Sequence, residues 1–127
     1  MRRGLLGLMV IGLVACSGST AVIEKVDPAT ASTIAAQPGT IVLDIRTPEE
    51  FAAGHLTGAI DVDFYATDFA DRIGALDHAA RYVVYCHTGN RSGQAMDLFR
   101  QDGFTDVHEI DGGIAAWVAA GLPITTG

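Results

Sequence analysis

Hydrophobic residues after position 21 fall into short runs that are separated by polar, glycine-containing or proline-containing segments. Apolar and β-branched residues dominate four of these runs, which is typical of strands in a sheet that is covered on both faces. Strands are therefore predicted at residues 22–26, 40–45, 81–85 and 106–110, with a brief fifth strand at residues 58–62.

The segments between these runs carry helix signals. Thr47, Pro48 and Glu50 form a capping-box pattern. Thr47 takes the cap position, Pro48 the first helical position, and Glu50 follows three residues after the cap. Apolar residues recur at intervals of three and four in the other segments, as on one face of a helix. Helices are predicted at residues 28–36, 48–53, 92–101 and 113–120, and residues 65–76 are expected to form one helix or two short ones.

The alternation of strands and helices predicts an α/β fold. We expect a mainly parallel central sheet of about five strands with helices on both faces, formed by residues 22–127. The chain of 127 residues can bury one compact core but is too short for two.

Residues 1–15 differ from the rest of the chain. A basic start at Arg2 and Arg3 precedes twelve uncharged, mainly apolar residues, Gly4 to Ala15. As a helix, these twelve residues would extend roughly 18 Å, against the roughly 30 Å of a hydrocarbon core. The pattern predicts a signal peptide instead of a transmembrane helix, and a buried N-terminal helix is the alternative.

The end of this run, Leu13-Val14-Ala15-Cys16, resembles the bacterial lipobox. The resemblance implies that residues 1–15 are removed, that Cys16 carries lipid such as palmitate, and that residues 16–21 tether the domain to a membrane of the cell envelope. The remaining chain would carry six basic and fifteen acidic side chains, so acyl chains are the expected attachment, not attraction to anionic headgroups.

Charge and histidine spacing narrow the classes of ligand. The formal charge of −7 argues against nucleic acid, because binding phosphates requires clustered Lys and Arg. His78 and His108 lack the spacing of metal ligands, and neither a metal nor another cofactor is expected. Asp61 and Asp63 are expected to be solvated, Trp117 to lie in the core, and His55 to bond the backbone at a helix end.

Cys86 directly follows the predicted strand at residues 81–85, where ligands bind in open α/β sheets. Gly89 allows the following segment to curl, so that successive main-chain N–H groups form an anion-binding nest at the start of the next helix. Arg91 adds a permanent cation, and His87 adds positive charge at lower pH. These features favour a thiolate, although a cysteine at a strand end can also pack simply as a small hydrophobe.

With Cys16 lipidated, Cys86 has no disulfide partner in the chain. Exported proteins usually pair their cysteines, which indicates that the thiol of Cys86 is kept free for chemistry.

The chain resembles the rhodanese family from about Val22 to Ile124, and the matching motifs follow in the same order along the sequence. The resemblance is carried by three blocks: Leu43-Asp44-Ile45-Arg46 with Glu50-Phe51, Gly54-His55-Leu56 and Gly58-Ala59-Ile60; Cys86 to Arg91-Ser92; and Asp111-Gly112-Gly113 with Trp117, Gly121 and Pro123.

The resemblance implies a sulfurtransferase. Cys86 would take a sulfane sulfur from a small donor such as thiosulfate or a polysulfide, hold it as a persulfide, and pass it to cyanide or a thiol, including a thiol on a partner protein. The loop of His87, Thr88, Gly89, Asn90 and Arg91 would bind the anionic groups. A monomer is expected.

Asp44 and Arg46 lie at the same predicted sheet edge. They could orient the active-site loop or steer substrate, and a structural ion pair or capping pair is the alternative.

Three other functions are weighed against catalytic sulfur transfer. Four residues separate Cys86 from Arg91, whereas phosphatase relatives have five, so a phosphoryl group is expected to fit poorly. A binding module that docks or relays sulfur remains an alternative. A thiol-redox protein would need a second cysteine to resolve a mixed disulfide.

His87 stands where many thiosulfate-using relatives carry Arg or Lys, which disfavours thiosulfate as the natural donor.

Overall fold

The computed structural model describes residue 12 and residues 20–127. The predicted signal peptide, Cys16 and most of the predicted tether lie outside the described residues. Within the described part of the chain, no helix is long and apolar enough to cross a membrane.

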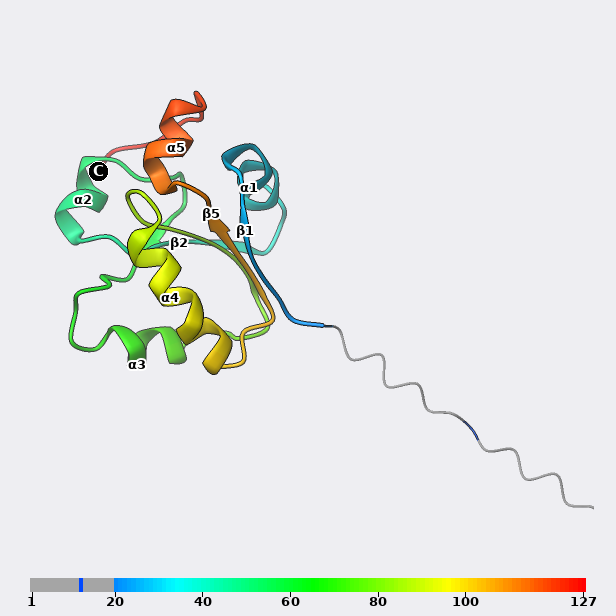
Figure 1. The fold of residues 1–127 in the computed structure, drawn as a ribbon. Coiled ribbons are helices and arrows are strands. Elements are labelled where there is room, and N and C mark those ends of the chain that lie inside the picture. Colours follow the sequence, from blue (N-terminus) through cyan, green and yellow to red (C-terminus); the bar gives the residue numbers. More distant parts are fainter. Residues whose placement is uncertain (1–11, 13–19) are drawn as a thin grey trace, which may run out of the picture.

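Five parallel strands form one sheet in the spatial order β1-β5-β4-β2-β3 (Figure 1). The predicted α/β fold class is confirmed. The strands are β1 (Val22–Val26), β2 (Thr40–Asp44), β3 (Ile60–Asp61), β4 (Arg81–Tyr85) and β5 (Asp106–Ile110).

The helices follow the predicted order, and the largest differences in their bounds concern the third and fourth helices. The fourth helix begins at Asn90, two residues earlier than predicted, because the loop after Cys86 turns directly into it. Tyr65 lies outside the third helix, in a turn where its main-chain N–H donates to Asp63 Oδ1 at 2.9 Å. The helices are α1 (Pro28–Ala35), α2 (Pro48–Ala53), α3 (Phe69–Gly74), α4 (Asn90–Gln101) and α5 (Gly113–Ala119).

Strand β4 divides its side chains between two hydrophobic layers. Tyr82, Val84 and Cys86 face the layer beneath α3 and α4, whereas Val83 and Tyr85 face the layer beneath α1 and α5. Figure 1 shows these two helix pairs on opposite sides of the sheet. The alternation follows from the two-residue period of a strand, and it directs the Cys86 side chain toward the start of α4.

The site lies where the connections of two neighbouring strands diverge. The chain leaves β2 toward β3 at one edge of the sheet, and it leaves β4 toward β5 in the opposite direction. Ligands in open α/β sheets bind at such a switch point, beyond the carboxyl ends of the strands. The loops after β2 and β4 therefore meet around Cys86.

Candidate active site

The loop after β4 curls around the Cys86 sulfur. The main-chain N–H groups of Gly89 and Ser92 donate to Sγ at 3.1 Å and 3.4 Å. Gly89 has φ +103°, a backbone conformation that glycine adopts without a Cβ clash. Because these donors converge on one sulfur, the loop forms the anion-binding nest that the sequence predicts.

The loop holds the pKa of Cys86 below its ordinary value. Burial alone raises this pKa, since the residue is only 1% exposed, but hydrogen bonds from Ser92, Gly89 and the N–H of Arg91 outweigh the burial. The 12-residue helix α4 starts at this loop and adds the partial positive charge of its N-terminus. The free thiol therefore lies in surroundings that favour its anion.

The start of α5 holds the loop from the opposite side. The N–H groups of Ile114 and Ala115 donate to the carbonyl oxygens of Cys86 and His87 at 2.9 Å and 3.0 Å. Gly113 has φ +63°, and a Cβ there would lie 2.5 Å from His87 O and 2.6 Å from Cys86 O. Only glycine fits at this position, so the start of α5 sets the path of the loop.

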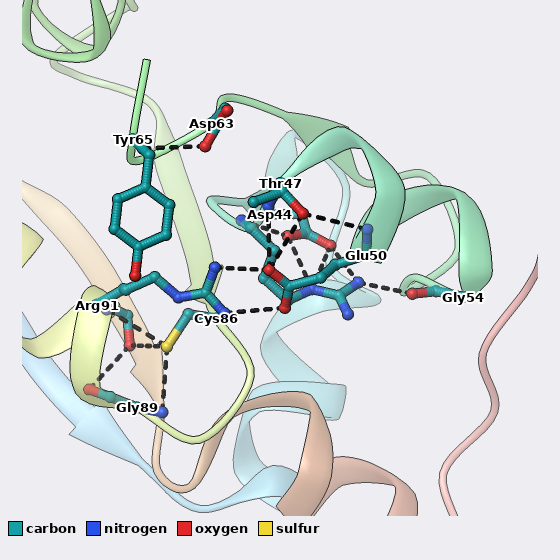
Figure 2. A network of polar contacts seen from close by, with 11 residues as sticks. Asp44, Thr47, Glu50, Gly54, Asp63, Tyr65, Cys86, Gly89 and Arg91 are labelled. Atoms are coloured by element: carbon teal, nitrogen blue, oxygen red, sulfur yellow. Dashed lines mark hydrogen bonds and ion pairs between the residues drawn. The ribbon is translucent and has the colours of Figure 1, made fainter. Parts of the chain in front are cut away.

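Arg91 extends from the loop to Glu50 on α2 (Figure 2). Its Nη1 and Nη2 donate to the two carboxylate oxygens at 2.8 Å and 2.9 Å, a bidentate pair. The guanidinium also stacks on the exposed ring of Tyr65, 5.5 Å from the ring centre. Arg91 is thus a cation whose charge is largely balanced by the carboxylate of Glu50.

Asp44 and Arg46 form a buried ion pair at the end of β2. Arg46 Nη2 lies 2.7 Å from Asp44 Oδ2 and also donates to the carbonyl oxygen of Gly54 at 2.6 Å. The Arg46 guanidinium lies over the Tyr85 ring, 5.5 Å from its centre. These contacts fix α2 on the sheet and agree with the structural alternative. Arg46 also lines the cavity beside His87, so a role in steering substrate stays a prediction.

The side chains of the remaining loop residues form no hydrogen bond with the sulfur in the described part of the chain. His87 and Thr88 are exposed, and the Asn90 side chain accepts from Gln94 Nε2 at 3.2 Å. His87 lines a cavity of about 330 Å³ between the loop, α2 and α5, with Val118 and Ile124 on its apolar wall. This cavity borders the loop that holds Cys86 and offers space for a second reactant.

Three acidic residues of the site were not identified from the sequence. Glu50 is the glutamate of the predicted capping box, but its pairing with Arg91 joins positions 41 residues apart and leaves no local signal. Glu109 is 2% exposed and accepts from the Ser92 hydroxyl, and an acidic residue inside a predicted strand was an available signal. Asp61 was expected to be solvated, but its Oδ1 is buried without a hydrogen-bond partner among the described residues.

Other polar residues lie as follows. Nδ1 of His55 contacts the carbonyl oxygen of Phe51 at 2.8 Å, as predicted for a helix end, and Trp117 lies in the core. His108 lies between Glu24 and Asp106, at 2.9 Å and 2.6 Å. Among residue 12 and residues 20–127, no three His, Cys, Asp or Glu side chains are arranged to hold a metal ion.

Comparison with known proteins agrees with this geometry. Residues 27–120 match the family model of the rhodanese-like domain. The thiosulfate sulfurtransferase GlpE of Pseudomonas aeruginosa is 44% identical over 79 residues, which are 62% of this chain and 70% of that protein. The protein of the same name from Pseudomonas putida is 38% identical over 96 residues, 76% of this chain and 86% of that one.

Solved structures of rhodanese-related proteins have the same fold as this chain. A rhodanese-related protein from Thermoplasma volcanium superposes with a TM-score of 0.72 at 25% identity, covering 81% of this chain and 98% of the other. With a matching family model, similar relatives and the same fold, the chain belongs to the family of rhodanese-like domains.

Proposed function

We propose that this protein is a sulfurtransferase that carries a sulfane sulfur on Cys86 as a persulfide. The observation that carries the proposal is the convergence of the Gly89 and Ser92 N–H groups on a single buried sulfur at 3.1 Å and 3.4 Å. Donors arranged in advance stabilise an anion without reorganisation, both for the thiolate and for the persulfide anion. The names of the relatives from Pseudomonas support the same reaction.

The reaction divides into two displacements at sulfur. The Cys86 thiolate attacks the outer sulfur of a donor such as thiosulfate or a polysulfide, a new S–S bond forms, and the donor's S–S bond breaks. With thiosulfate, sulfite leaves with the electron pair of that bond. A thiolate or cyanide acceptor then attacks the outer sulfur, and Cys86 leaves as the thiolate that began the cycle. This is covalent catalysis, in which one transfer becomes two easier steps.

The dimensions of the loop favour sulfur over a phosphoryl group. The nest places donors on the sulfur itself at 3.1 Å and 3.4 Å. The phosphatase alternative would need a cradle that holds three further oxygens as well. The six positions from Cys86 to Arg91 form the smaller ring, and the Arg91 guanidinium is engaged by Glu50 instead of facing into the loop.

The acceptor is proposed to be a thiol that approaches through the cavity beside His87. The apolar wall of this cavity, with half-exposed Val118 and Ile124, suits a carbon chain or a peptide segment that presents a thiol. A partner protein with an exposed cysteine meets these requirements, as does a small thiol.

The proposed location is the cell envelope. The lipobox-like sequence at Leu13 to Cys16 supports lipidation of Cys16 and anchoring of residues 22–127 beside a bacterial membrane. Metabolic labelling with palmitate tests this part independently of catalysis. Label is expected on the wild-type chain and not on Cys16→Ser, and equal labelling of the two would refute the anchor.

The function is tested by weighing the intact protein after incubation with thiosulfate or a polysulfide. A gain of one sulfur atom is expected, removed by cyanide with formation of thiocyanate and absent in Cys86→Ser. Persistence of the added sulfur when cyanide or thiols are supplied would indicate the alternative, a binding module. No gain with either donor would contradict the sulfurtransferase.

A further inference from the structure

A buried carboxylate lies directly behind the nucleophile. Ser92 Oγ is 3.4 Å from Cys86 Sγ and 2.6 Å from Glu109 Oε2, so the hydroxyl bridges the sulfur and the carboxylate. Ser92 is fully buried and Glu109 is 2% exposed. Cys86 directly follows β4, Ser92 lies on α4 and Glu109 on β5, and they meet because Cys86 and Glu109 face the same layer of the sheet.

The Ser92 hydroxyl has one proton, for which Glu109 Oε2 at 2.6 Å competes with the Gly89 carbonyl oxygen and the Cys86 sulfur, both at 3.4 Å. The distance of 2.6 Å to Glu109 is that of a charge-assisted O–H···O⁻ bond. When the proton points to Glu109, the serine oxygen offers only lone pairs to Cys86, and it can accept from the thiol but cannot stabilise the thiolate. Glu109 therefore takes the Ser92 hydroxyl proton away from the Cys86 sulfur, which keeps its main-chain N–H donors.

Few other charges reach this carboxylate. From β1, Lys25 pairs with Glu109 in the sheet, but its side chain is exposed, and no ion pair joins the two in the described part of the chain. From β4, the paired residue is the uncharged Val84, with Cys86 beyond the end of the strand. From α4, Ser92 and Gly93 face it, and both are uncharged.

We propose that Glu109 is a positioning residue that sets the direction of the Ser92 hydroxyl and couples its own charge to that of the Cys86 sulfur. The negative charge of Glu109 opposes the thiolate in two ways: like charges within about 6 Å disfavour each other, and the bridging proton points to the carboxylate. In a variant without that charge, the Ser92 hydroxyl is free to donate to the thiolate.

Such coupling suits a sulfur that must both attack and leave. The nucleophilicity of a thiolate falls as its pKa falls, and a thiol attacks best when its pKa is near the ambient pH. The amide nest lowers the pKa of the Cys86 thiol, and the charge of Glu109 acts in the opposite direction. This use of the coupling in sulfur transfer rests on the proposed function, whereas the coupling itself is measured on the free thiol without any sulfur donor.

The test is the pH profile of Cys86 alkylation by iodoacetamide in the full chain, followed by mass spectrometry of the peptide that contains Cys86. With Glu109→Gln, alkylation near pH 6 is expected to be about tenfold faster than in the wild type, and the two rates converge at high pH where both thiols are ionised. Asp97→Asn, an exposed acid on the same helix as Ser92, is the control and leaves the profile unchanged. An unchanged or slower rate near pH 6 in Glu109→Gln overturns the proposal.

A second arm tests whether the coupling passes through Ser92. In a Ser92→Ala background, the effect of Glu109→Gln is expected to shrink to less than half, since the bridging proton is gone. An effect of full size in that background shows that Glu109 acts only through space and overturns its positioning role.

A third measurement uses the wild-type sequence, so it stands even if the variants unfold. Alkylation of Cys86 replaces an anion with a neutral thioether, and difference infrared spectroscopy is expected to show a change in a carboxyl band. The band change must be absent in Cys86→Ser treated in the same way. A carboxyl spectrum that does not respond to the sulfur contradicts the coupling.

Discussion

Arg91 and Glu50 join the loop after β4 to the helix after β2 through two parallel bonds, at 2.8 Å and 2.9 Å. The arginine side chain is 13% exposed and the glutamate side chain 32% exposed, so water screens the pair only partly. The same carboxylate accepts from the main-chain N–H of Thr47 at 3.4 Å and closes the capping box. One acidic residue therefore holds both the start of α2 and the outer wall of the active-site loop.

Neutralising Glu50 is expected to lower stability in a pH-dependent manner. Arg91 is the main cause that lowers the pKa of Glu50 to about 2, below the roughly 4.3 of an unfolded glutamate. The stabilisation is complete above the unfolded value and is lost as the pH falls from there through about 2. In urea titrations, Glu50→Gln should unfold more easily than the wild type near neutral pH, and the gap should narrow toward about pH 2.

Glu49→Gln is the matched control, because Glu49 is exposed in the same first turn of α2. A stability loss of equal size in both variants, or one independent of pH, would speak against the Arg91 pair.

Gly113→Ala is expected to disturb the active-site loop beyond the cost of its backbone conformation. The added Cβ would meet main-chain oxygens of His87 and Cys86 at 2.5 Å and 2.6 Å, so the loop must move. We expect a loss of more than about 2 kcal/mol in the free energy of unfolding, together with slower alkylation of Cys86.

Gly121→Ala provides the comparison, since Gly121 has φ +78° but no atom within 4 Å of an added Cβ. It should show only the conformational cost of about 1–2 kcal/mol, with alkylation unchanged. If the two variants behave alike, the contact with the loop is not what requires glycine at position 113.

Asp61→Asn is expected to stabilise the protein above pH 6 only. Burial, followed by the nearby charges of Asp44 and Asp63, raises the pKa of Asp61 to about 6. Since this value lies above that of an unfolded aspartate, the folded state bears a penalty that grows from about pH 4 and is complete above about pH 6.

The melting temperature of Asp61→Asn should therefore exceed that of the wild type at about pH 8 and match it at about pH 4. Asp68→Asn, at an exposed helix start without a side-chain cap bond, is the control. A gain that is the same at both pH values would point to packing instead of charge.

His87→Arg is expected to improve the use of thiosulfate. His87 is exposed on the rim of the loop, and a permanent cation there attracts a dianion. The KM for thiosulfate should fall roughly fivefold with kcat nearly constant, and the gain should shrink at high salt. His87→Gln serves as the uncharged control, and an unchanged KM in His87→Arg would show that the rim does not bind the donor.

The parts of this molecule that local sequence determines were predictable. The capping box of Thr47 and Glu50, the period of two in β4 and the glycine turn after Cys86 depend on residues within a few positions of each other. The lipidation of Cys16 remains a prediction.

The site's electrostatics could not be predicted in this way. The Arg91 and Glu50 pair spans 41 positions, and the Ser92 and Glu109 bond spans 17, so both depend on which strands become neighbours. Strand order is set by the packing of the whole sheet, and the switch point between β2 and β4 appears only once that order is known. The balance of charge around Cys86 is therefore a tertiary property.

The most direct test of the account is the rate at which Cys86 of the wild-type protein reacts with iodoacetamide as a function of pH. If the main-chain N–H groups of Gly89 and Ser92 hold the sulfur as an anion, half-maximal reactivity will lie clearly below the roughly 8.5 of an ordinary cysteine. Half-maximal reactivity at or above that value would contradict the thiolate nest.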